Sequence, residues 1–271
     1  GAFLGTGAIM LFAVAGCSGR PPAVDARAET EAWRAKHEAD YRRDWSTIAG
    51  LHFLNEGPNT AGSDASNQVV LPATVPASLG RFVLSGEAVT FEPASGAGVT
   101  LREQQVTAPL GLEDDGEKET DELRVGDVKM VIPRSGPKKT LRVWDPNGPL
   151  AKGFQGFRWF DIQTDYRVTG RFIPDAAPRA MRVVNTFGDL DEYTTEGVLE
   201  FVLNGRTLRL RPFTTRPKRF YIVFKDASSG EETYDAARFL YADLRDDGTA
   251  VLDFNQAYNP PCSFNPYTTC P

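Results

Sequence analysis

The feature that most constrains this fold is a succession of short apolar segments separated by glycine, proline, asparagine and aspartate. Such segments are typical of β-strands, and their regular recurrence predicts an all-β sandwich or barrel. Strands are expected at residues 69–71, 80–84, 88–92, 99–104, 122–125, 128–133, 140–144, 166–173, 180–185, 197–203, 206–211, 219–225, 238–242 and 249–254. Between two alternating segments, Asn204-Gly205 is the strongest hairpin signal in the chain.

One segment departs from this pattern. Between Ala26 and Ile48, the aromatic side chains of Trp33, His37 and Tyr41 recur about every four residues, which is the period of one helix face. Charged residues occupy the remaining positions, so we predict an amphipathic helix whose aromatic stripe packs against the rest of the protein. The expected fold is therefore mainly β, an antiparallel sandwich or barrel-like domain with one N-terminal amphipathic helix.

The beginning of the chain has the character of an export signal. Residues 8–15 (AIMLFAVA) form an apolar run that is shorter than the roughly 20 residues of a transmembrane helix. Val14-Ala-Gly-Cys17 resembles the lipobox of bacterial lipoproteins, in which the cysteine thiolate accepts a diacylglycerol group. We predict a signal peptide over residues 1–17, lipidation at Cys17 and a tether over residues 18–27. The alternative is an ordinary signal peptide with a chance cysteine.

This export signal sets further expectations. Without an initiator methionine or a basic segment before it, the sequence is expected to start inside the signal. The protein would be anchored by lipid in a bacterial cell envelope, and in a Gram-negative host it would lie on the outer membrane facing the periplasm. In an oxidising compartment, Cys262 and Cys270 are expected to form a disulfide.

Composition argues against several function classes. The net charge is −6, with acidic and basic residues interspersed, whereas nonspecific nucleic-acid binding needs a basic face. Two histidines and three cysteines argue against a zinc enzyme, and we predict no metal site. Neither a Ser-His-Asp set nor a glycine-rich nucleotide loop can be assigned. The sequence does not identify a cofactor.

Two polar segments leave alternatives open. Residues 110–121 (LGLEDDGEKETD) are strongly acidic and could bind calcium, but their spacing does not follow the EF-hand pattern, and a solvated hairpin is the simpler interpretation. Gly62-Ser63-Asp64 could form an anion-binding nest, but a plain turn is favoured.

Polar residues at the ends of the last strands suggest a ligand site. These are Asp226, Glu232, Tyr234, Arg238, Asp253 and Asn255 and, more remotely, His52 and Asn67. A hairpin between the last two strands would bring the start of one beside the end of the next, and therefore Arg238 beside Asp253. Arg238 could hold a carboxylate or phosphate in a bidentate fork, with Asp253 orienting it. His52 precedes a polar loop that could cover the same edge. The structural alternative is a buried Arg–Asp pair that joins strands.

Several segments also resemble those of a known family. The chain is similar to the bacterial domain-of-unknown-function 1684 family over about residues 29–271. The matching pieces include Gly50-Leu-His-Phe-Leu54, Leu141-Arg-Val-Trp-Asp145, Arg238-Phe-Leu-Tyr241 and the ending Asp253-Phe-Asn-Gln-Ala-Tyr-Asn-Pro-Pro-Cys262. The resemblance implies a single secreted or lipid-anchored β-rich domain over residues 28–271. It brings no known activity, cofactor or catalytic residue.

The chain departs from this family in two places. Relatives continue past the equivalent of Cys270-Pro271, so we expect the sequence to be truncated at its C-terminus. Relatives also favour glycine before the Arg-Phe-Leu motif, where this chain has Ala236-Ala237.

Three functions remain open from the sequence. The leading hypothesis is an envelope lipoprotein whose β domain binds a small anionic or hydroxylated ligand through His52, Tyr234, Arg238, Asp253 and Asn255. One alternative is a hydrolase-type enzyme with His52 or a carboxylate as general base, and the other is a structural envelope component. A pocket that joins the polar set would favour binding or catalysis over a structural role.

Overall fold

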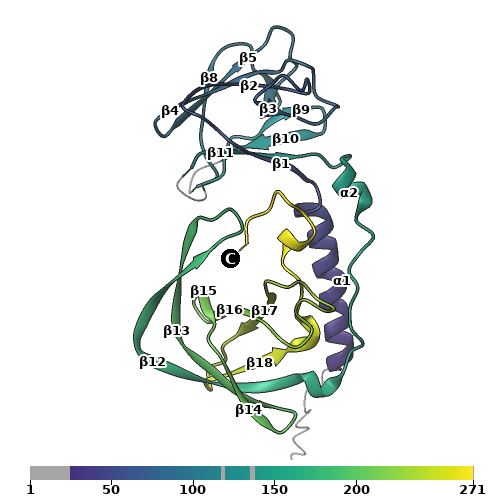
Figure 1. Ribbon diagram of the computed structural model, residues 1–271, viewed down its shortest axis with the longest axis vertical. Helices are drawn as coiled ribbons and strands as arrows, with labels where there is room; N and C mark the ends of the chain where they lie inside the picture. Colours follow the sequence, from purple (N-terminus) through teal and green to yellow (C-terminus); the bar gives the residue numbers. More distant parts are fainter. Residues whose placement is uncertain (1–24, 117–119, 135–137, 271) are drawn as a thin grey trace, which may run out of the picture.

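The computed structural model describes residues 25–116, 120–134 and 138–270. The predicted signal peptide and Cys17 lie outside these residues, as does most of the tether. The protein is mainly β with antiparallel sheets and one long N-terminal helix, which confirms the predicted fold class. Figure 1 shows two β units stacked along the long axis, with α1 (Ala26–Asp44) running beside the lower one.

The upper unit is a sandwich of two sheets. Its strands are β1 (Ile48–Phe53), β2 (Gly57–Gly62), β3 (Val69–Val70), β4 (Gly80–Ser85), β5 (Ala88–Pro93), β6 (Thr100–Leu101), β7 (Gln104–Gln105), β8 (Leu110–Leu112), β9 (Leu123–Val125), β10 (Val128–Val131) and β11 (Thr140–Trp144). One sheet has the order β1-β11-β10-β9-β6-β7 and the other β3-β2-β4-β5-β8. Phe82 and Phe91 of one sheet share a core with Leu123 and Leu141 of the other, and all four are fully buried.

The lower unit resembles a closed barrel. Its strands are β12 (Arg167–Val184), β13 (Leu190–Leu203), β14 (Arg206–Leu210), β15 (Phe213–Arg216), β16 (Arg219–Phe224), β17 (Arg238–Asp243) and β18 (Thr249–Asp253). They form the sheets β14-β13-β12-β18 and β15-β16-β17. The two sheets contact each other on both sides of the unit, where β13 lies against β15 and the edge strands β17 and β18 lie together.

Apolar side chains fill the interior of this barrel. Leu199, Ile222 and Leu252 are fully buried there, and Phe220 and Leu240 are 1% exposed. Because side chains alternate along a strand, Tyr221 and Phe239 point to the outer face, where the C-terminal tail covers them in a second cluster with Cys270. The interior of the barrel is thus a packed apolar core.

Local sequence explains two details of the strands. Asn204 and Gly205 both have positive φ (51° and 72°), as a two-residue type I′ turn requires, and they join β13 to β14 as predicted. Residues 166–173 and 180–185 were expected to be separate strands, but they form the single strand β12. Its pairing with β13 shifts between Pro174 and Arg179, where proline supplies no backbone N–H.

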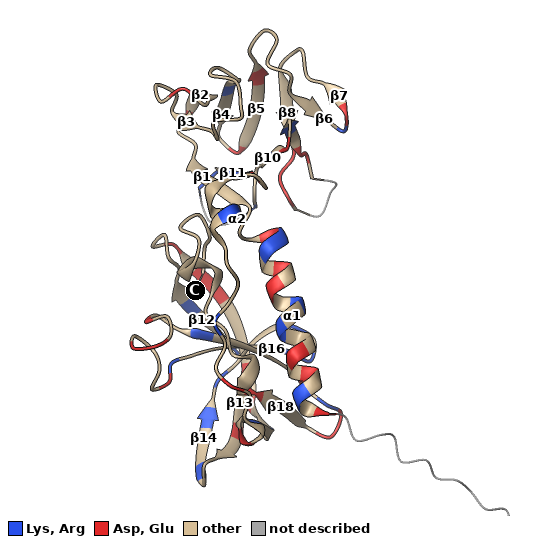
Figure 2. Cartoon of the chain, turned by 90° about the vertical axis from the view of Figure 1, so that its right-hand side faces the viewer, with Lys and Arg blue, Asp and Glu red and all other residues tan. Residues whose placement is uncertain are grey.

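Helix α1 connects the chain to both units. Asp25 caps its N-terminus, because its carboxylate accepts hydrogen bonds from the backbone N–H groups of Arg27 and Ala28. The helix ends at Asp44 rather than near Ile48, because Ile48 pairs with Trp144 in β1. The aromatic stripe packs as predicted: the ring of His37 lies 4.7 Å from Trp33 and 4.2 Å from Tyr258. Figure 2 shows that basic and acidic positions alternate along the ribbon of this helix.

The remaining helices are short. They are α2 (Pro149–Gly153) and the 3-10 turns η1 (Thr164–Tyr166), η2 (Phe254–Gln256) and η3 (Pro261–Ser263). Among the described helices, none combines the length and the apolar character needed to cross a bilayer.

Candidate functional site

Arg238 lies at one end of the barrel interior. It is the first residue of β17, on the same strand face as the buried Leu240, and its guanidinium carbon lies 6.0 Å from the ring centroid of Phe224. One terminal nitrogen donates to Asp226 Oδ2 (2.7 Å), and the other donates to the backbone carbonyl of Ala257 (2.8 Å). The predicted buried Arg–Asp pair therefore exists, but its acid is Asp226.

The ion pair between Arg238 and Asp226 lies between buried and solvent-exposed groups. Arg238 is only 9% exposed, and its Nε is a buried donor with no hydrogen-bond partner among the described residues. The ring of Phe160, which is 46% exposed, lies 5.7 Å from the guanidinium. Burial opposes ionisation of Asp226, but hydrogen bonds from Ser228 and Arg238 keep the pKa of this carboxyl below its usual value. The barrel end thus combines a partly exposed carboxylate, an incompletely satisfied guanidinium and an open aromatic face.

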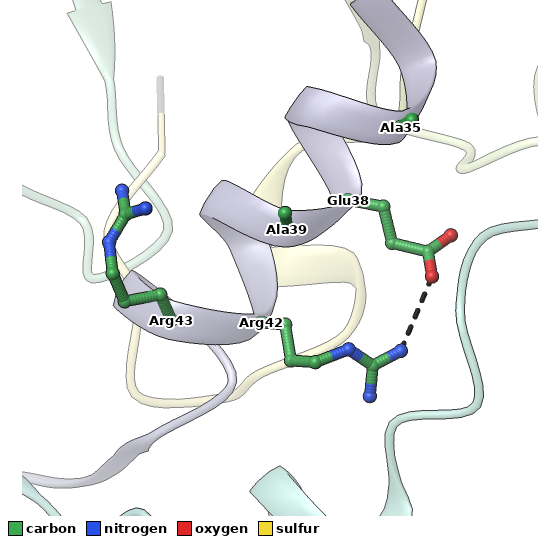
Figure 3. A pocket seen from close by; sticks show the side chains of 5 residues that line it. All are labelled: Ala35, Glu38, Ala39, Arg42 and Arg43. Atoms are coloured by element: carbon green, nitrogen blue, oxygen red, sulfur yellow. Dashed lines mark hydrogen bonds and ion pairs between the residues drawn. The ribbon is translucent and has the colours of Figure 1, made fainter. Parts of the chain in front are cut away.

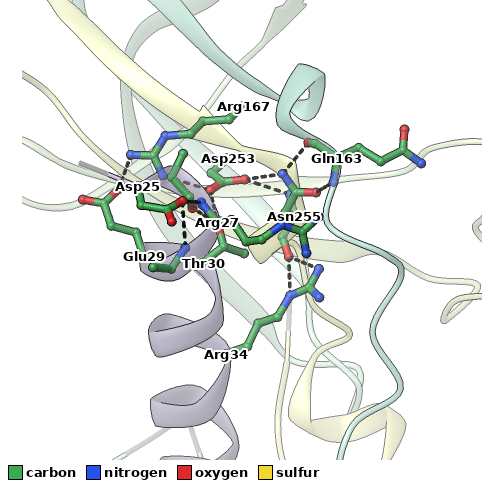
Figure 4. A network of polar contacts seen from close by, with 11 residues as sticks. Asp25, Arg27, Glu29, Thr30, Arg34, Gln163, Arg167, Asp253 and Asn255 are labelled. Carbon is green, nitrogen blue, oxygen red and sulfur yellow. Dashed lines mark hydrogen bonds and ion pairs between the residues drawn. The ribbon is translucent and has the colours of Figure 1, made fainter. Parts of the chain in front are cut away.

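Asp253 and Asn255 belong to a separate network beneath α1 (Figure 4). Asp253 accepts hydrogen bonds from the Thr30 hydroxyl (2.7 Å), from Arg167 (3.1 Å) and from the backbone N–H and side-chain amide of Asn255 (3.1 and 2.8 Å). The side chain of Asn255 also exchanges a pair of 2.9 Å hydrogen bonds with the backbone of Gln163. This network ties the segment before β12 and the start of α1 to the end of β18.

Strand alternation explains why Asp253 and Arg238 do not meet. The fully buried Leu252 faces the barrel interior, so Asp253, the next residue, faces outward towards α1. Arg238 shares the inward face of β17 with Leu240. The expected pairing of the last two strands is not found, because β17 pairs with β16 and β18 pairs with β12 in a different sheet. Arg238 therefore points into the barrel from one sheet, and Asp253 points away from it on the other.

His52 lies on β1 of the upper unit, where it pairs with Leu141 (Figure 1). Its ring folds back over Gly50, because a Cβ added at Gly50 would lie 2.6 Å from His52 Nε2. Burial lowers the pKa of His52 below its ordinary value, and the described residues give its ring no hydrogen-bond partner. The structure therefore brings His52 together with none of the other predicted site residues.

Tyr234 lies beside the C-terminal tail. Its backbone N–H donates to Asn259 Oδ1 (3.1 Å), and its side chain hydrogen-bonds with the Cys262 thiol. The backbone N–H of Cys262 in turn contacts Cys270 Sγ at 3.4 Å. The hydrogen bond between the thiols lowers the pKa of Cys262 and raises that of Cys270. Both cysteines are thiols in the structure, so the disulfide stays a prediction, and their proximity is compatible with it.

The two ambiguous polar segments have local partners. The backbone N–H groups of Ser63 and Asp64 donate to the carbonyls of Pro76 and Ala77, so Gly62-Ser63-Asp64 is a turn whose N–H groups are already in use. In the acidic segment, Asp121 accepts hydrogen bonds from Arg102 and from the backbone of Glu113. The described residues contain no group of three or more histidine, cysteine or acidic side chains arranged for a metal ion.

A surface hollow of about 580 Å³ lies along the outer side of α1 and is lined by Ala35, Glu38, Ala39, Arg42 and Arg43 (Figure 3). Its charges already have partners. Glu38 contacts Arg42 (3.2 Å) and accepts from the backbone N–H of Phe157, and Arg42 also donates to the carbonyl of Phe154. The hollow therefore lies where α1 packs against the segment that follows α2. Glu38 and Arg42, which line it, already have protein partners and are poor candidates for binding a ligand.

Sequence reasoning missed the residues that complete both networks. Phe160, Arg167 and Thr30 contribute to them from segments far from β17 and β18. The Thr30 position could have been suspected, because it is a small polar residue on the helix with Trp33 and Tyr41. No local signal assigns Arg167 to Asp253, which is 86 residues away in the sequence.

A family model matches the C-terminal part of the chain, and it carries no activity. Residues 152–271 match the model of a family described as "Protein of unknown function (DUF1684)", which confirms the resemblance over these residues. The rest of the expected resemblance, from residue 29 to residue 151, lies outside the match. No curated protein matches the chain.

Solved structures show only weak likeness. A solution NMR structure of an uncharacterised protein from gene locus rrnAC0354 of Haloarcula marismortui is 28% identical, with a TM-score of 0.38 over 47% of this chain and 73% of that one. Mycobacterium tuberculosis EmbR, in a complex with a low affinity phosphopeptide, is 19% identical, with a TM-score of 0.25 over 44% of this chain and 30% of that one. Scores this low say nothing about what this chain binds.

Proposed function

We propose that this chain, in which residues 152–271 form a DUF1684 domain, is an envelope lipoprotein that binds a small anionic or hydroxylated ligand. Cys17 carries the lipid anchor, and the signal peptide directs export. The ligand site is the barrel end formed by Arg238, Asp226 and Phe160.

The observation that supports a ligand there is the buried Nε of Arg238, which has no partner among the described residues. Leaving a buried donor unsatisfied costs about 1–3 kcal/mol, and an apolar side chain of similar size would avoid this cost if the position served packing alone. Phe160 covers the guanidinium from a segment without regular secondary structure, and nearly half of its surface is open to solvent. Rotation of this ring would give a ligand oxygen access to the arginine.

The same geometry restricts the ligand. Asp226 occupies one terminal nitrogen of Arg238, and its side chain is 35% exposed. A hydroxyl group can donate to this carboxylate and accept from the guanidinium, and a ligand carboxylate can do only the latter. A sugar or another polyhydroxylated molecule therefore fits the pair of groups better than a simple anion does.

A structural envelope component is the second candidate, and the Asp253 network favours it. Every polar atom of Asp253 and Asn255 in Figure 4 has a partner from α1, β12, the segment before β12 or the other member of the pair. Such a network serves to fasten α1 to the barrel. In this interpretation, Arg238 and Asp226 only join β17 to the loop after β16.

Substitution of Arg238 by methionine separates the two functions. Purified Arg238→Met protein and the matched control Arg219→Met, which removes an ion-paired arginine from the neighbouring strand β16, would be melted with a panel of sugars, sugar phosphates and dicarboxylates. Ligand binding predicts a compound that raises the Tm of the wild type and of Arg219→Met but not of Arg238→Met. If Arg238→Met instead lowers the Tm strongly and no compound shifts the wild type, the site has a structural role.

A further inference from the structure

A second arginine, far from the barrel end, lies on the sandwich strand β11. Along β11 the fully buried Leu141 and Val143 face the sandwich core, so Thr140, Arg142 and Trp144 face the outer side of the sheet. Cross-strand register places Leu51 of β1 and Val131 of β10 beside Arg142. This outer face is directed towards the lower β unit, since Phe53 of β1 contacts Phe187 from the turn between β12 and β13 at 5.6 Å.

Arg142 is half-buried, and its guanidinium makes no hydrogen bond or ion pair in the described part of the chain. Its Nε is buried and has no partner, and the hydroxyl oxygen of Thr140, two residues away on the same face, is also buried without one. The guanidinium only approaches the ring of Trp144, at 6.0 Å. Burial lowers the pKa of Arg142, which agrees with this lack of partners.

The charges around Arg142 are mainly positive. Lys138 lies on the same face with its ammonium 5.3 Å from the ring of Phe53, and Lys129 of β10 lies 4.2 Å from the ring of Trp144. The acidic groups nearby are Asp115, which attracts Arg142 from a distance, and Glu122, which contacts Lys129 at 3.3 Å. Asp115 also accepts a hydrogen bond from the backbone of Arg134. Neither carboxylate pairs with the Arg142 guanidinium.

An arginine without a partner at this position does not stabilise the folded protein. Leaving the buried Nε donor without a partner costs about 1–3 kcal/mol, whereas an apolar side chain of the same length would pack on β11 without that cost. The neighbouring arginines have such partners: Arg124 pairs with Glu122 and Arg134 with Asp114. Arg142 lacks one at the junction of two β units, which is a common location for ligand sites.

We propose that the outer face of β11 binds an oxyanion, a phosphate or carboxylate group, through Arg142. The planar fork of a guanidinium matches two oxygens of such a group, and Lys138 adds a second positive charge. The Thr140 hydroxyl supplies a further donor once a small movement gives the ligand access to it. This site is distinct from the barrel end around Arg238, and it would let an anion stabilise the contact between the upper and lower units.

The test uses the mature chain with sodium phosphate and sodium succinate as separate probes, and sodium chloride at matched ionic strength as reference. Binding of the oxyanion raises the Tm of the wild type as the probe concentration increases, beyond the effect of chloride. Comparison of phosphate with succinate decides which oxyanion is preferred. Calorimetric titration then gives the affinity for the better probe.

Two variants assign the effect to Arg142. Arg142→Met should abolish the Tm response, and without the probe it should be as stable as the wild type or more so, since it removes a buried donor that has no partner among the described residues. Arg142→Lys keeps the charge but loses the fork and should bind at least about tenfold more weakly. The control Arg124→Met removes an exposed arginine from β9 of the same sheet and should respond like the wild type.

The opposite results would overturn the proposal. A wild type that responds equally to both probes and to chloride has no oxyanion site on this face. An unchanged response in Arg142→Met and Arg142→Lys places the anion elsewhere on the protein. If Arg142→Met unfolds, Arg142→Lys is compared with Arg124→Met, because the first keeps the positive charge on β11 and the second changes an exposed residue. Equal responses of these two variants would then overturn the proposal.

Discussion

Replacement of Asp253 by alanine tests how α1 is fastened to the barrel. The carboxylate is 4% exposed and accepts hydrogen bonds from Thr30, Arg167 and Asn255. Loss of one member of a buried charged pair typically costs about 3–5 kcal/mol. We expect a loss near the lower end of this range, because each partner of Asp253 keeps another contact after the substitution.

Each partner retains part of its bonding after the substitution. Arg167 is 26% exposed and still contacts Glu29, so water and this carboxylate relieve its charge. The Thr30 hydroxyl can donate to the carbonyl of Ala26, which lies 2.9 Å away, and the Asn255 amide keeps its bond to Gln163. The expected loss for Asp253→Ala is therefore about 3 kcal/mol, and Thr30→Val, which removes a single neutral donor, should cost about 1 kcal/mol.

The assay is urea denaturation followed by tryptophan fluorescence, since Trp33 of α1 packs against Trp159 of the segment that covers it. At about 2–4 °C per kcal/mol, Asp253→Ala should also lower the Tm by about 6–12 °C, and Thr30→Val by a third of that. If both variants melt within one degree of the wild type, the network does not hold α1, and the reasoning from its hydrogen bonds is wrong.

Three further predictions concern the anchor, the tail and α1. Expression of the full precursor in a bacterium should give a protein that pellets with membranes, and Cys17→Ser should release it, because several acyl chains at about 0.8 kcal/mol per buried CH₂ make a stable anchor. Exported protein should show no titratable thiol from Cys262 and Cys270 until it is reduced, and their disulfide should stabilise the domain by about 2.6 kcal/mol for a loop of about nine residues; two free thiols in unreduced protein would refute this. Burial lowers the pKa of His37 from 6.5 to about 4. Between these pH values the unfolded chain binds a proton that the folded chain excludes, so stability should fall by up to about 3 kcal/mol on acidification from pH 6.5 to pH 4. His37→Phe should flatten this slope in urea titrations at each pH, and an unchanged slope would assign it to other groups such as His52.

The candidate site illustrates what the sequence could and could not supply. Sequence reasoning selected Arg238, Asp253 and Asn255 because polar side chains at strand ends are unusual, and the structure finds all three buried with polar partners. It paired Arg238 with Asp253, whereas Asp226 holds the arginine and Arg167 contacts the aspartate. The inward or outward direction of each side chain depends on which strand face forms the core, and a polar residue at a strand end does not reveal that.

The sequence by itself determined the local features of this protein. Apolar alternation and turn residues specified strands, Asn204-Gly205 specified a hairpin, and a four-residue aromatic period specified the helix that carries Trp33, His37 and Tyr41. These features depend on backbone preferences within a few residues, which any copy of the segment would share. Only the tertiary structure decided that the strands divide into a sandwich and a barrel, that α1 lies against the barrel, and that Arg142 lacks a partner while Arg238 has one. These outcomes depend on contacts between residues far apart in the chain. Which of these contacts form is decided by the packing of the whole core and not by any one segment.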